Sequence, residues 1–147
     1  WKSIKTSDSG QFVYIIASYG YIYRSNDYLS TISVSNSIKR AYNSLSTCST
    51  GQYVVSTAAS LIYVSNDYGI TWSEINKFGS LKWTDISMSS SGQYIYFIAS
   101  MNKIYKASNF IDSSNISVSL DQNMKWQSII CSSTGAEVYT TVRHGYI

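Results

Sequence analysis

The sequence repeats with a period of about 41 residues. The dipeptide Gly-Gln begins at positions 10, 51 and 92, and Gly135 follows 43 residues after the last of them. Nine residues before each glycine stands a large aromatic residue, and three residues after that aromatic stands an aliphatic one. The aromatics are Trp1, Tyr42, Trp83 and Trp126, and the aliphatics are Ile4, Leu45, Ile86 and Ile129. A period of this length predicts a repeat architecture.

Each repeat has the pattern of short antiparallel strands. Ser, Thr and Asp residues precede each glycine, which is the composition of a tight turn whose glycine takes a positive φ. The runs that follow are β-branched, aromatic and almost continuously apolar, which predicts second strands covered on both faces, at 12–17, 53–58, 94–99 and 138–142. A hairpin turn containing Gly20, Ser60, Asn102 or Gly145 precedes the expected third strands, at 21–23, 61–63, 103–105 and 146–147. More polar fourth strands are expected at 30–35, 70–75 and 115–120.

Four antiparallel strands in each unit of about 41 residues predict an all-β chain of β-propeller blades. No long window carries a 3.6-residue apolar period, so helix is not expected. The blades are expected at 1–40, 41–81, 82–124 and 125–147, with the last one truncated. The chain is then a single repeat domain of about three and a half blades, an incomplete or open propeller. A parallel β-helix is the structural alternative, although its coils are shorter than this period.

Charge and composition limit the classes of function. The chain has 11 Lys and Arg residues against 8 Asp and Glu residues, with the signs interspersed, so nucleic acid is not expected as a partner. No run approaches the roughly 18 apolar residues of a membrane span, and the chain reads as soluble. Cys48 and Cys131 lack the spacing of a zinc site. We expect small buried thiols in strands, with a disulfide as the alternative, and no metal or cofactor.

The segment 65–72 reads Ser-Asn-Asp-Tyr-Gly-Ile-Thr-Trp. In it, Asp67 is expected to accept hydrogen bonds from backbone N–H groups of its own hairpin, and Gly69 to supply a left-handed turn conformation. Trp72 is expected to pack between sheets. A weaker copy at 25–31 keeps Asp27 but has no glycine, and in the third repeat Asn109 stands for the aspartate. These features favour a structural role over catalysis for Asp67.

This segment resembles the Asp-box, or bacterial neuraminidase (BNR) repeat, Ser-x-Asp-x-Gly-x-Thr-Trp. The motif residues are Ser65, Asp67, Gly69, Thr71 and Trp72, with Asp27 in the weaker copy. The resemblance implies a β-propeller of the superfamily that includes sialidases, sortilin-type receptors, some endoglucanases and photosynthetic assembly factors, whose shared blades do not imply a shared activity. The composition and the blade motifs are also similar to repeat proteins of large DNA viruses and protists. The compartment stays open, between secreted or lumenal and virion-associated.

The sequence holds little support for catalysis. The resemblance to sialidases implies an arginine triad, but Arg24, Arg40 and Arg143 occupy different places in the repeat, and a chain without proline lacks the Arg-Ile-Pro segment of that family. Asp85, in the middle of a first strand, is the best remaining acid, and we favour a strand residue that faces a water-filled channel. The single histidine, His144, has no partner for a triad or a metal site, and a surface turn is its expected place.

Basic residues and tyrosines recur in the links between blades and in the hairpins between second and third strands. Both kinds of loop belong to the same rim of a blade, opposite the segment 65–72. We call this set the basic rim: Lys39, Arg40, Lys82, Lys125, Tyr19, Tyr21, Lys103 and Arg143. Such a rim predicts a surface for an acidic partner or a glycan, through charge-assisted hydrogen bonds and aromatic stacking. A solvated, solubilising surface is the plainer interpretation of the same pattern.

The sequence therefore favours a non-enzymatic propeller segment that works as a scaffold or protein-interaction surface. The alternative is a carbohydrate-active propeller, a lectin or a sialidase-like glycoside hydrolase whose catalytic residues lie outside this chain. The truncated fourth blade leaves three interpretations: part of a longer propeller, a ring completed by homo-oligomerisation, or an arc capped by another protein. The expected partners are accordingly the remaining blades, a second copy or another protein, with a glycan or acidic ligand at the rim.

Overall fold

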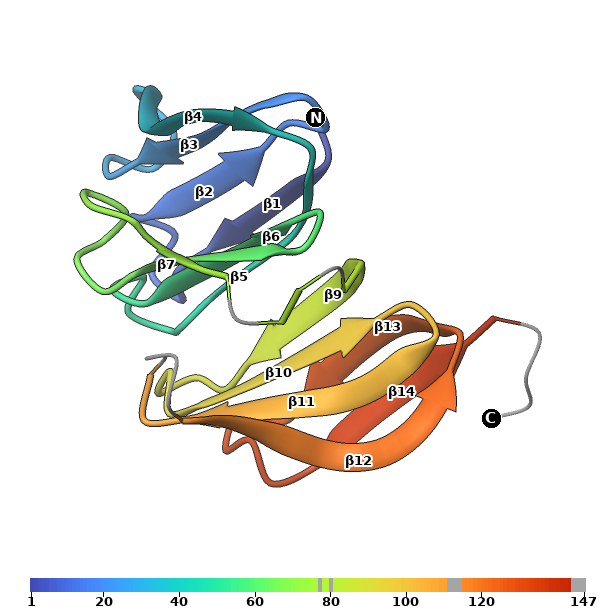
Figure 1. The fold of residues 1–147 in the computed structure, drawn as a ribbon. Helices are drawn as coiled ribbons and strands as arrows, with labels where there is room; N and C mark the ends of the chain where they lie inside the picture. Colours follow the sequence, from blue (N-terminus) through green and yellow to red (C-terminus); the bar gives the residue numbers. More distant parts are fainter. Residues whose placement is uncertain (77, 80, 111–114, 144–147) are drawn as a thin grey trace.

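A computed structural model describes residues 1–76, 78–79, 81–110 and 115–143. Within these residues there is no helix, and so none that could span a membrane. The described strands form three four-stranded sheets and one two-stranded sheet, each pairing antiparallel neighbours in chain order. We call the sheets blades 1 to 4. Figure 1 shows them following one another along the molecule. The structure therefore confirms the predicted all-β chain of four-stranded units.

The strands of each blade follow one another in the sequence. Blade 1 contains β1 (Ser3–Thr6), β2 (Val13–Ile16), β3 (Gly20–Ser25) and β4 (Ser33–Arg40). Blade 2 contains β5 (Tyr42–Thr47), β6 (Val54–Ala58), β7 (Leu61–Ser65) and β8 (Ser73–Ile75). Blade 3 contains β9 (Trp83–Met88), β10 (Tyr94–Ala99), β11 (Asn102–Ser108) and β12 (Ile116–Met124). Blade 4 contains β13 (Trp126–Cys131) and β14 (Val138–Val142). Its predicted third strand, with Gly145 in the turn, lies outside the described residues.

The hydrophobic core is divided into three clusters, each between two successive blades. The first cluster joins Tyr14 and Ile16 of blade 1 to Tyr42 and Leu45 of blade 2. The second cluster joins blade 2 to blade 3 and includes Val55, Ile62, Trp83 and Ile86. The third joins blade 3 to blade 4 and includes Tyr96, Ile98, Trp126 and Ile129. The recurring aromatic and aliphatic residues of the first strands are therefore the side chains that pack each blade onto the preceding one.

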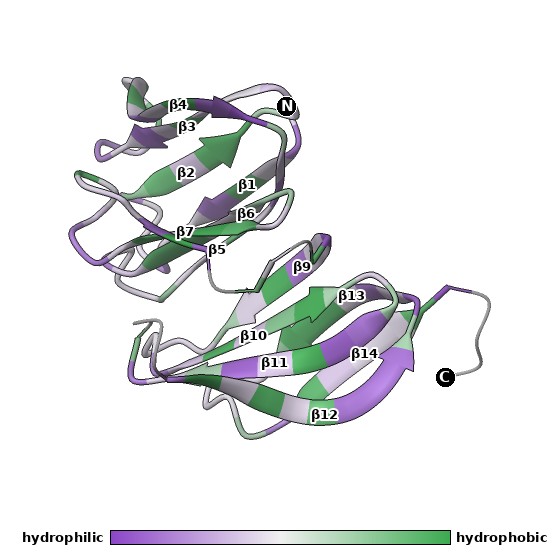
Figure 2. Ribbon diagram, in the orientation of Figure 1, coloured by the Kyte–Doolittle hydropathy of each residue, from purple (hydrophilic) through white to green (hydrophobic). Residues whose placement is uncertain are grey.

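Second strands have the composition of fully covered strands because a blade packs on each of their faces. Every residue of β6 is buried, and in β10 only Tyr94 is partly exposed. Figure 2 shows β2 and β10 mostly hydrophobic, and the outer strand β12 hydrophilic over much of its length. By contrast, β14 of the last blade alternates between exposed and half-buried residues. One face of blade 4 is thus open.

Several strand boundaries differ from the sequence prediction. The strands β4 and β8 begin at Ser33 and Ser73, three residues later than expected, because the hairpins of Asp27 and Asp67 hold the preceding residues in turns. The strands β4 and β12 also extend further, to Arg40 and Met124. Gly20 and Asn102 are the first residues of β3 and β11, so the hairpin turns lie just before them.

Both cysteines are free, so the disulfide alternative is wrong. Cys131 ends β13, but Cys48 lies in the turn after β5 rather than in a strand. The Cys48 thiol accepts a hydrogen bond from the Tyr53 N–H at 3.2 Å. In blades 1 and 3 the hydroxyls of Ser7 and Ser89 accept the corresponding bonds, at 3.1 Å and 3.0 Å. Cys48 therefore takes the place of a turn serine in this repeat.

Candidate functional site

The links between blades and the hairpins between second and third strands lie together on one rim. Backbone hydrogen bonds join the two kinds of loop: the Ser100 N–H donates to the Lys82 carbonyl and the Arg143 N–H to the Lys125 carbonyl, each at 2.9 Å. The Asp67 hairpin lies at the other end of blade 2, where the Tyr68 N–H donates to the Gln52 carbonyl at 3.1 Å. The loops of the basic rim therefore lie at the end of the blades opposite the Asp67 hairpin, and Tyr21, Lys39, Arg40 and Lys103 are strand residues near them.

Two cations of the basic rim are engaged by neighbouring side chains. The Arg40 Nε donates to the Tyr63 hydroxyl at 3.2 Å, and this hydroxyl donates to the Glu74 carboxylate at 2.9 Å. The hydrogen bond to Tyr63 raises the pKa of Arg40 above its ordinary value. Lys103 forms an ion pair with Asp121 at 2.7 Å. Each of these cations therefore already has a side-chain partner, Arg40 in the neutral Tyr63 hydroxyl and Lys103 in the Asp121 carboxylate.

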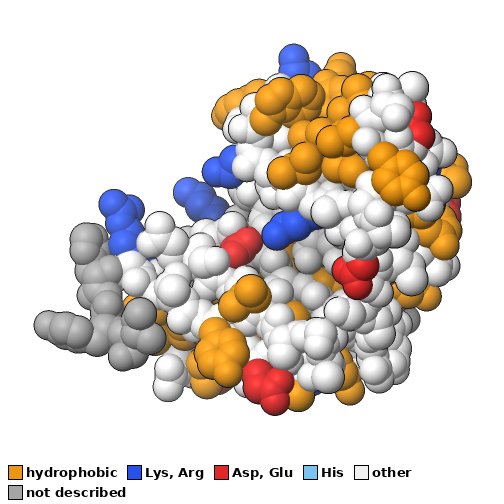
Figure 3. Space-filling view, turned by 180° about the vertical axis from the view of Figure 1, so that it is seen from behind, with side chains coloured by type: hydrophobic (Ala, Val, Ile, Leu, Met, Phe, Trp, Pro, Cys, Tyr) orange, Lys and Arg blue, Asp and Glu red, His pale blue; other side chains and the backbone are white. Residues whose placement is uncertain are grey.

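Other members of the basic rim do not converge on one place. Tyr19 is 82% exposed at a hairpin tip, whereas Tyr21 contacts the edge of Tyr23 with ring centroids 6.2 Å apart. Lys39 and Lys82 are exposed and belong to different links. Figure 3 shows basic side chains spread over this side of the molecule rather than gathered in a single cluster.

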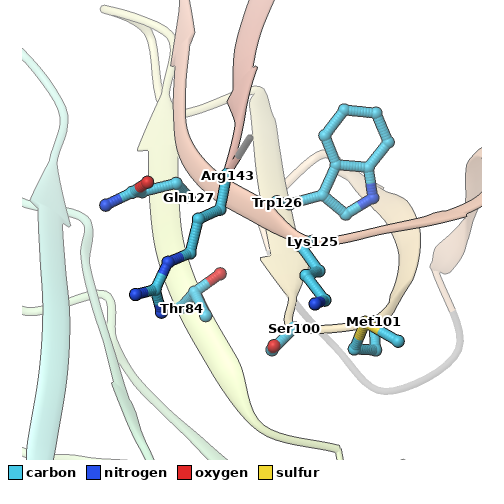
Figure 4. Close-up of a pocket in the computed structure, with 7 residues that line it drawn as sticks. All are labelled: Thr84, Ser100, Met101, Lys125, Trp126, Gln127 and Arg143. Atoms are coloured by element: carbon cyan, nitrogen blue, oxygen red, sulfur yellow. The ribbon is translucent and has the colours of Figure 1, made fainter. Parts of the chain in front are cut away.

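Lys125 and Arg143 meet at a pocket between blades 3 and 4. The pocket has a volume of about 390 Å³, and its lining consists of Thr84, Ser100, Met101, Lys125, Trp126, Gln127 and Arg143. Figure 4 shows Arg143 extending towards Thr84 and Lys125 pointing towards Ser100. Among the described residues, no acidic side chain lines the pocket. Two cations beside hydroxyl and amide groups form a site for an anionic or strongly polar group.

The pocket is held in shape by contacts that span the two blades. The Trp126 ring is buried against blade 3, and its Nε1 donates to the Asn102 carbonyl at 2.6 Å. This contact fixes the start of β13, so that Lys125 and Gln127 flank the pocket. The Thr84 hydroxyl donates to the Ile98 carbonyl at 3.2 Å, which leaves its oxygen free to accept from a ligand.

Four lining residues, Thr84, Ser100, Met101 and Gln127, were not predicted from the sequence. A signal for two of them exists, because Thr84 and Gln127 follow the large aromatic of their repeats directly, where Lys2 and Asn43 stand in the first two repeats. A polar residue therefore recurs at this place in all four repeats. Ser100 and Met101 carry no such signal, because only the hairpin geometry brings them to the pocket.

Asp85 connects three blades through its carboxylate. It accepts hydrogen bonds from the Ser44 hydroxyl of blade 2 at 2.7 Å and from the Ser128 hydroxyl and Ile129 N–H of blade 4 at 2.9 Å and 3.0 Å. The Ile86 N–H donates a fourth bond at 3.0 Å. Ser44, Asp85 and Ser128 hold the same position in successive repeats. The predicted channel-facing acid is therefore a half-buried tie between first strands.

The carboxylate of Asp67 closes its own hairpin. It accepts bonds from the Ser65 hydroxyl, the Ile70 N–H, and both the N–H and hydroxyl of Thr71, the last at 2.6 Å. Burial alone would raise the pKa of Asp67, but these hydrogen bonds outweigh it and hold the pKa below 3.8. The Trp72 Nε1 donates to the Ser35 hydroxyl of blade 1 at 2.9 Å, and its ring packs on the core cluster between blades 1 and 2.

Asp27 repeats this arrangement in blade 1. Its carboxylate accepts bonds from the Ser25 hydroxyl at 2.8 Å and from the hydroxyl of Thr31 at 2.6 Å, and the bonds from Thr31 lower its pKa. Blade 3 differs from the prediction. Asn109 donates its N–H to the Gln93 carbonyl at 2.8 Å and has a φ of 58°. In blade 2 it is Tyr68 that makes the corresponding bond, to Gln52, with a φ of 60°, so Asn109 corresponds to Tyr68 and not to Asp67. The turn of blade 3 is closed by the Asn115 amide instead.

The three arginines do not form a triad. Arg24 donates to the Tyr68 carbonyl at 2.9 Å at the opposite end of the blades from Arg143, and Arg40 is held by Tyr63. His144 lies outside the described residues. Within the described residues, no group of three His, Cys, Asp or Glu side chains is placed to hold a metal ion.

Comparison with known proteins supports the fold alone. No model of a protein family and no curated protein sequence matches the chain. A chain in the crystal structure of a nidogen/laminin complex matches 87% of this chain with a TM-score of 0.64 and 18% identity, and 52% of that chain is covered. Hydrazine synthase from Kuenenia stuttgartiensis matches 93% with a TM-score of 0.66 and 15% identity, and 40% of that chain is covered. Both similarities support a β-propeller fold for this chain, which spans about half or less of either neighbour.

Proposed function

We propose that this chain is a non-enzymatic β-propeller segment that works as an interaction scaffold and holds an acidic side chain of a protein partner in the pocket between blades 3 and 4. The observation that carries the proposal is the pairing of Lys125 and Arg143 in one pocket without an acidic lining residue. Arg40 and Lys103, by contrast, already have partners. An uncompensated cationic pocket attracts carboxylates both at long range and by direct hydrogen bonds.

Three further observations support a scaffold over an enzyme. Asp85, the best candidate acid, already accepts four hydrogen bonds and has a structural task. The segment 65–72 has hydrogen bonds that suit an Asp-box acting as a hairpin closure, because the donors to Asp67 come from its own turn. One neighbour in fold belongs to a nidogen/laminin complex, an assembly between proteins.

A fluorescent hexaglutamate peptide is the probe that tests the pocket. Its binding to the chain is measured by anisotropy at low and at physiological salt. We expect the double variant Lys125→Gln, Arg143→Gln to weaken binding about tenfold or more, because two charge-assisted contacts are lost. The control double variant Lys5→Gln, Lys39→Gln removes the same charge outside the pocket and should change binding by less than about twofold.

Equal weakening in both double variants would contradict the proposal, since it would show a response to net charge alone. An array of neutral, sialylated and sulfated glycans addresses the carbohydrate-active alternative. Glycan binding that the pocket variant abolishes, together with no peptide binding, would favour a lectin. A flat array would leave the acidic protein partner as the ligand of this site.

A further inference from the structure

The outer strands of blades 1 and 2 enclose another pocket, which we call the outer pocket. It has a volume of about 240 Å³. The strands β4 and β8, outermost in their sheets, both contribute to it. None of its lining residues belongs to the pocket between blades 3 and 4. Its lining includes Asn36 and Ile38 of β4, Tyr63 of β7, Ile70 and Trp72 of the Asp67 hairpin, and Glu74 of β8.

Asn36 occupies a position of the repeat that is apolar in blades 2 and 3. It pairs with Ile22 of the neighbouring strand, as Ile75 pairs with Ile62 in blade 2. In blade 3 the corresponding residue is Leu120. Ile75 is buried in the core cluster between blades 2 and 3. Blade 1 buries an amide at the same place, because Asn36 is only 6% exposed.

One end of the Asn36 amide has no partner. Its Oδ1 accepts from the Ile38 N–H at 3.0 Å, and this bond fixes which end of the amide is the oxygen, because an N–H group needs an acceptor. Its Nδ2 is buried without a hydrogen-bond partner in the described part of the chain. Buried polar groups are normally paired, since an unpaired one costs free energy. A ligand in the outer pocket can supply the acceptor that the chain does not.

Glu74 is a second departure from the repeat, and it comes from the other blade. It pairs with Tyr63, whereas the tyrosines at the same position in blades 1 and 3 pair with Val34 and Val118. The Glu74 side chain is exposed, and its carboxylate accepts from the Tyr63 hydroxyl at 2.9 Å. A carboxylate has lone pairs for several bonds, so Glu74 can accept from a ligand as well.

The corresponding place between blades 2 and 3 is filled by an aromatic ring. There Phe78 packs edge-on against Trp83 and Tyr105, with ring centroids 5.3 Å and 5.4 Å apart. Blade 1 has Ser37 at the place of Phe78, counted back from the large aromatic that follows. The junction between blades 1 and 2 is therefore polar and hollow where the next junction is apolar and packed.

We propose that the outer pocket binds one pyranose ring of a neutral glycan. The Asn36 Nδ2 donates to a ring or hydroxyl oxygen of the sugar, and the Glu74 carboxylate accepts from one of its hydroxyls. Trp72, Ile38 and Ile70 provide apolar surface for the C–H groups of the ring. A sugar ring presents hydroxyl groups and C–H groups together in one compact unit, which is the combination that this pocket contains.

Charge and hydrogen bonding exclude other classes of ligand. An acidic group would be repelled by Glu74. A basic group cannot accept from the Asn36 Nδ2, and it would meet Arg40, whose Nε donates to the Tyr63 hydroxyl at 3.2 Å. A purely apolar group would leave the Asn36 amide unpaired. A peptide amide both donates and accepts, but its flat group lacks the C–H face that matches Trp72.

Titration of the whole nitrogen-15-labelled chain, followed by NMR, tests this inference. The probes are neutral tetrasaccharides of α-linked glucose, β-linked glucose, mannose and N-acetylglucosamine. We expect saturable binding of at least one of them, with a shift of the Asn36 side-chain amide signals. Asn36→Asp keeps an oxygen for the Ile38 N–H but removes the donor, and should weaken binding about tenfold or more. Glu74→Gln should also weaken it about tenfold, because a charge-assisted bond becomes a neutral one.

Two control variants make the same chemical changes at exposed positions outside the outer pocket. Asn26→Asp and Glu137→Gln should bind the sugar like the wild type. The variant Lys125→Gln, Arg143→Gln should also bind it normally, and Glu74→Gln should bind the hexaglutamate peptide like the wild type. The two pockets are thus tested independently. Circular dichroism confirms that each variant is folded, and Glu74→Gln decides the result if Asn36→Asp does not fold.

Three outcomes would overturn the inference. The first is a chain that binds none of the four sugars. The second is sugar binding that the folded variants at Asn36 and Glu74 leave unchanged. The third is binding of an uncharged peptide of serine and glutamine that depends on both residues, without any sugar binding, which would assign the outer pocket to a peptide segment.

Discussion

At the scale of single residues, neighbouring blades decide where a glycine is required. Leu29 and Gly69 hold the same place in the hairpins of blades 1 and 2, and both have a left-handed backbone, with φ of 66° and 73°. A Cβ on Gly69 would lie 2.9 Å from the Ser35 hydroxyl and 3.0 Å from the Tyr14 ring, both in blade 1. Leu29 is 46% exposed. The turn tolerates its side chain at the cost of backbone strain alone.

We predict that Leu29→Gly stabilises the chain by about 0.5–1 kcal/mol, because it relieves a left-handed leucine at little loss of packing. Gly69→Ala should destabilise it by about 1–3 kcal/mol, since strain and a steric clash act together. Urea unfolding measures both free energies. Leu29→Ala keeps the strain and serves as the control. A destabilised Leu29→Gly variant would show that the leucine side chain contributes packing that outweighs the strain.

At the scale of elements, the Asp hairpins are closed by ionised carboxylates. Asp27 and Asp67 accept bonds from the same set of turn donors, and both have a lowered pKa. The unfolded chain lacks these donors, so its aspartates bind protons first as the pH falls. The contribution of such a hairpin to stability is therefore fully present above the unfolded pKa and is lost as the pH falls towards the folded one.

We predict that the free energy of unfolding decreases as the pH falls below 3.8, the ordinary value for an aspartate, and that Asp67→Asn reduces this dependence. The variant should also be less stable than the wild type at neutral pH, because the amide cannot accept the full set of bonds. Denaturant unfolding at a series of pH values measures the slope. Asp8→Asn changes an exposed aspartate outside these hairpins and is the control. An unchanged slope in Asp67→Asn would contradict the prediction.

At the scale of the whole molecule, the first strands are tied together around Asp85. At the repeat position of Asp85, blades 2 and 4 have serines, Ser44 and Ser128. Asp85 bonds to the blade before it and the blade after it. These ties lie between blades, so they act on how the blades are held together rather than on any one sheet.

We predict that Asp85→Ala lowers the free energy of unfolding by about 3 kcal/mol, because it leaves several donors without a charged acceptor. Asp121→Ala removes one exposed ion pair and should cost less than about 1 kcal/mol. Thermal and urea unfolding compare the two variants. The same unfolding free energy in both would show that Asp85 is solvated rather than a tie between blades.

The basic rim shows how far a sequence predicts a site. The repeat predicted that the rim residues lie on one side of the blades, and their role as a binding surface stays a prediction. The repeat pattern did not indicate that Arg40 and Lys103 have partners, because Tyr63 and Asp121 reach them through packing and strand register. It also placed Asn109 at the position of Asp67, whereas the Asn109 N–H donates to the Gln93 carbonyl as the Tyr68 N–H donates to the Gln52 carbonyl.

The period, the order of strands and the turn chemistry can be predicted from the sequence, since they depend on residues close together along the chain. Which charges line the pocket and why Gly69 must be a glycine depend on the tertiary structure. The reason is that contacts between blades join residues about one repeat apart, such as Ser44 with Asp85 and Tyr14 with Gly51. Such contacts form only after each blade has folded beside the next.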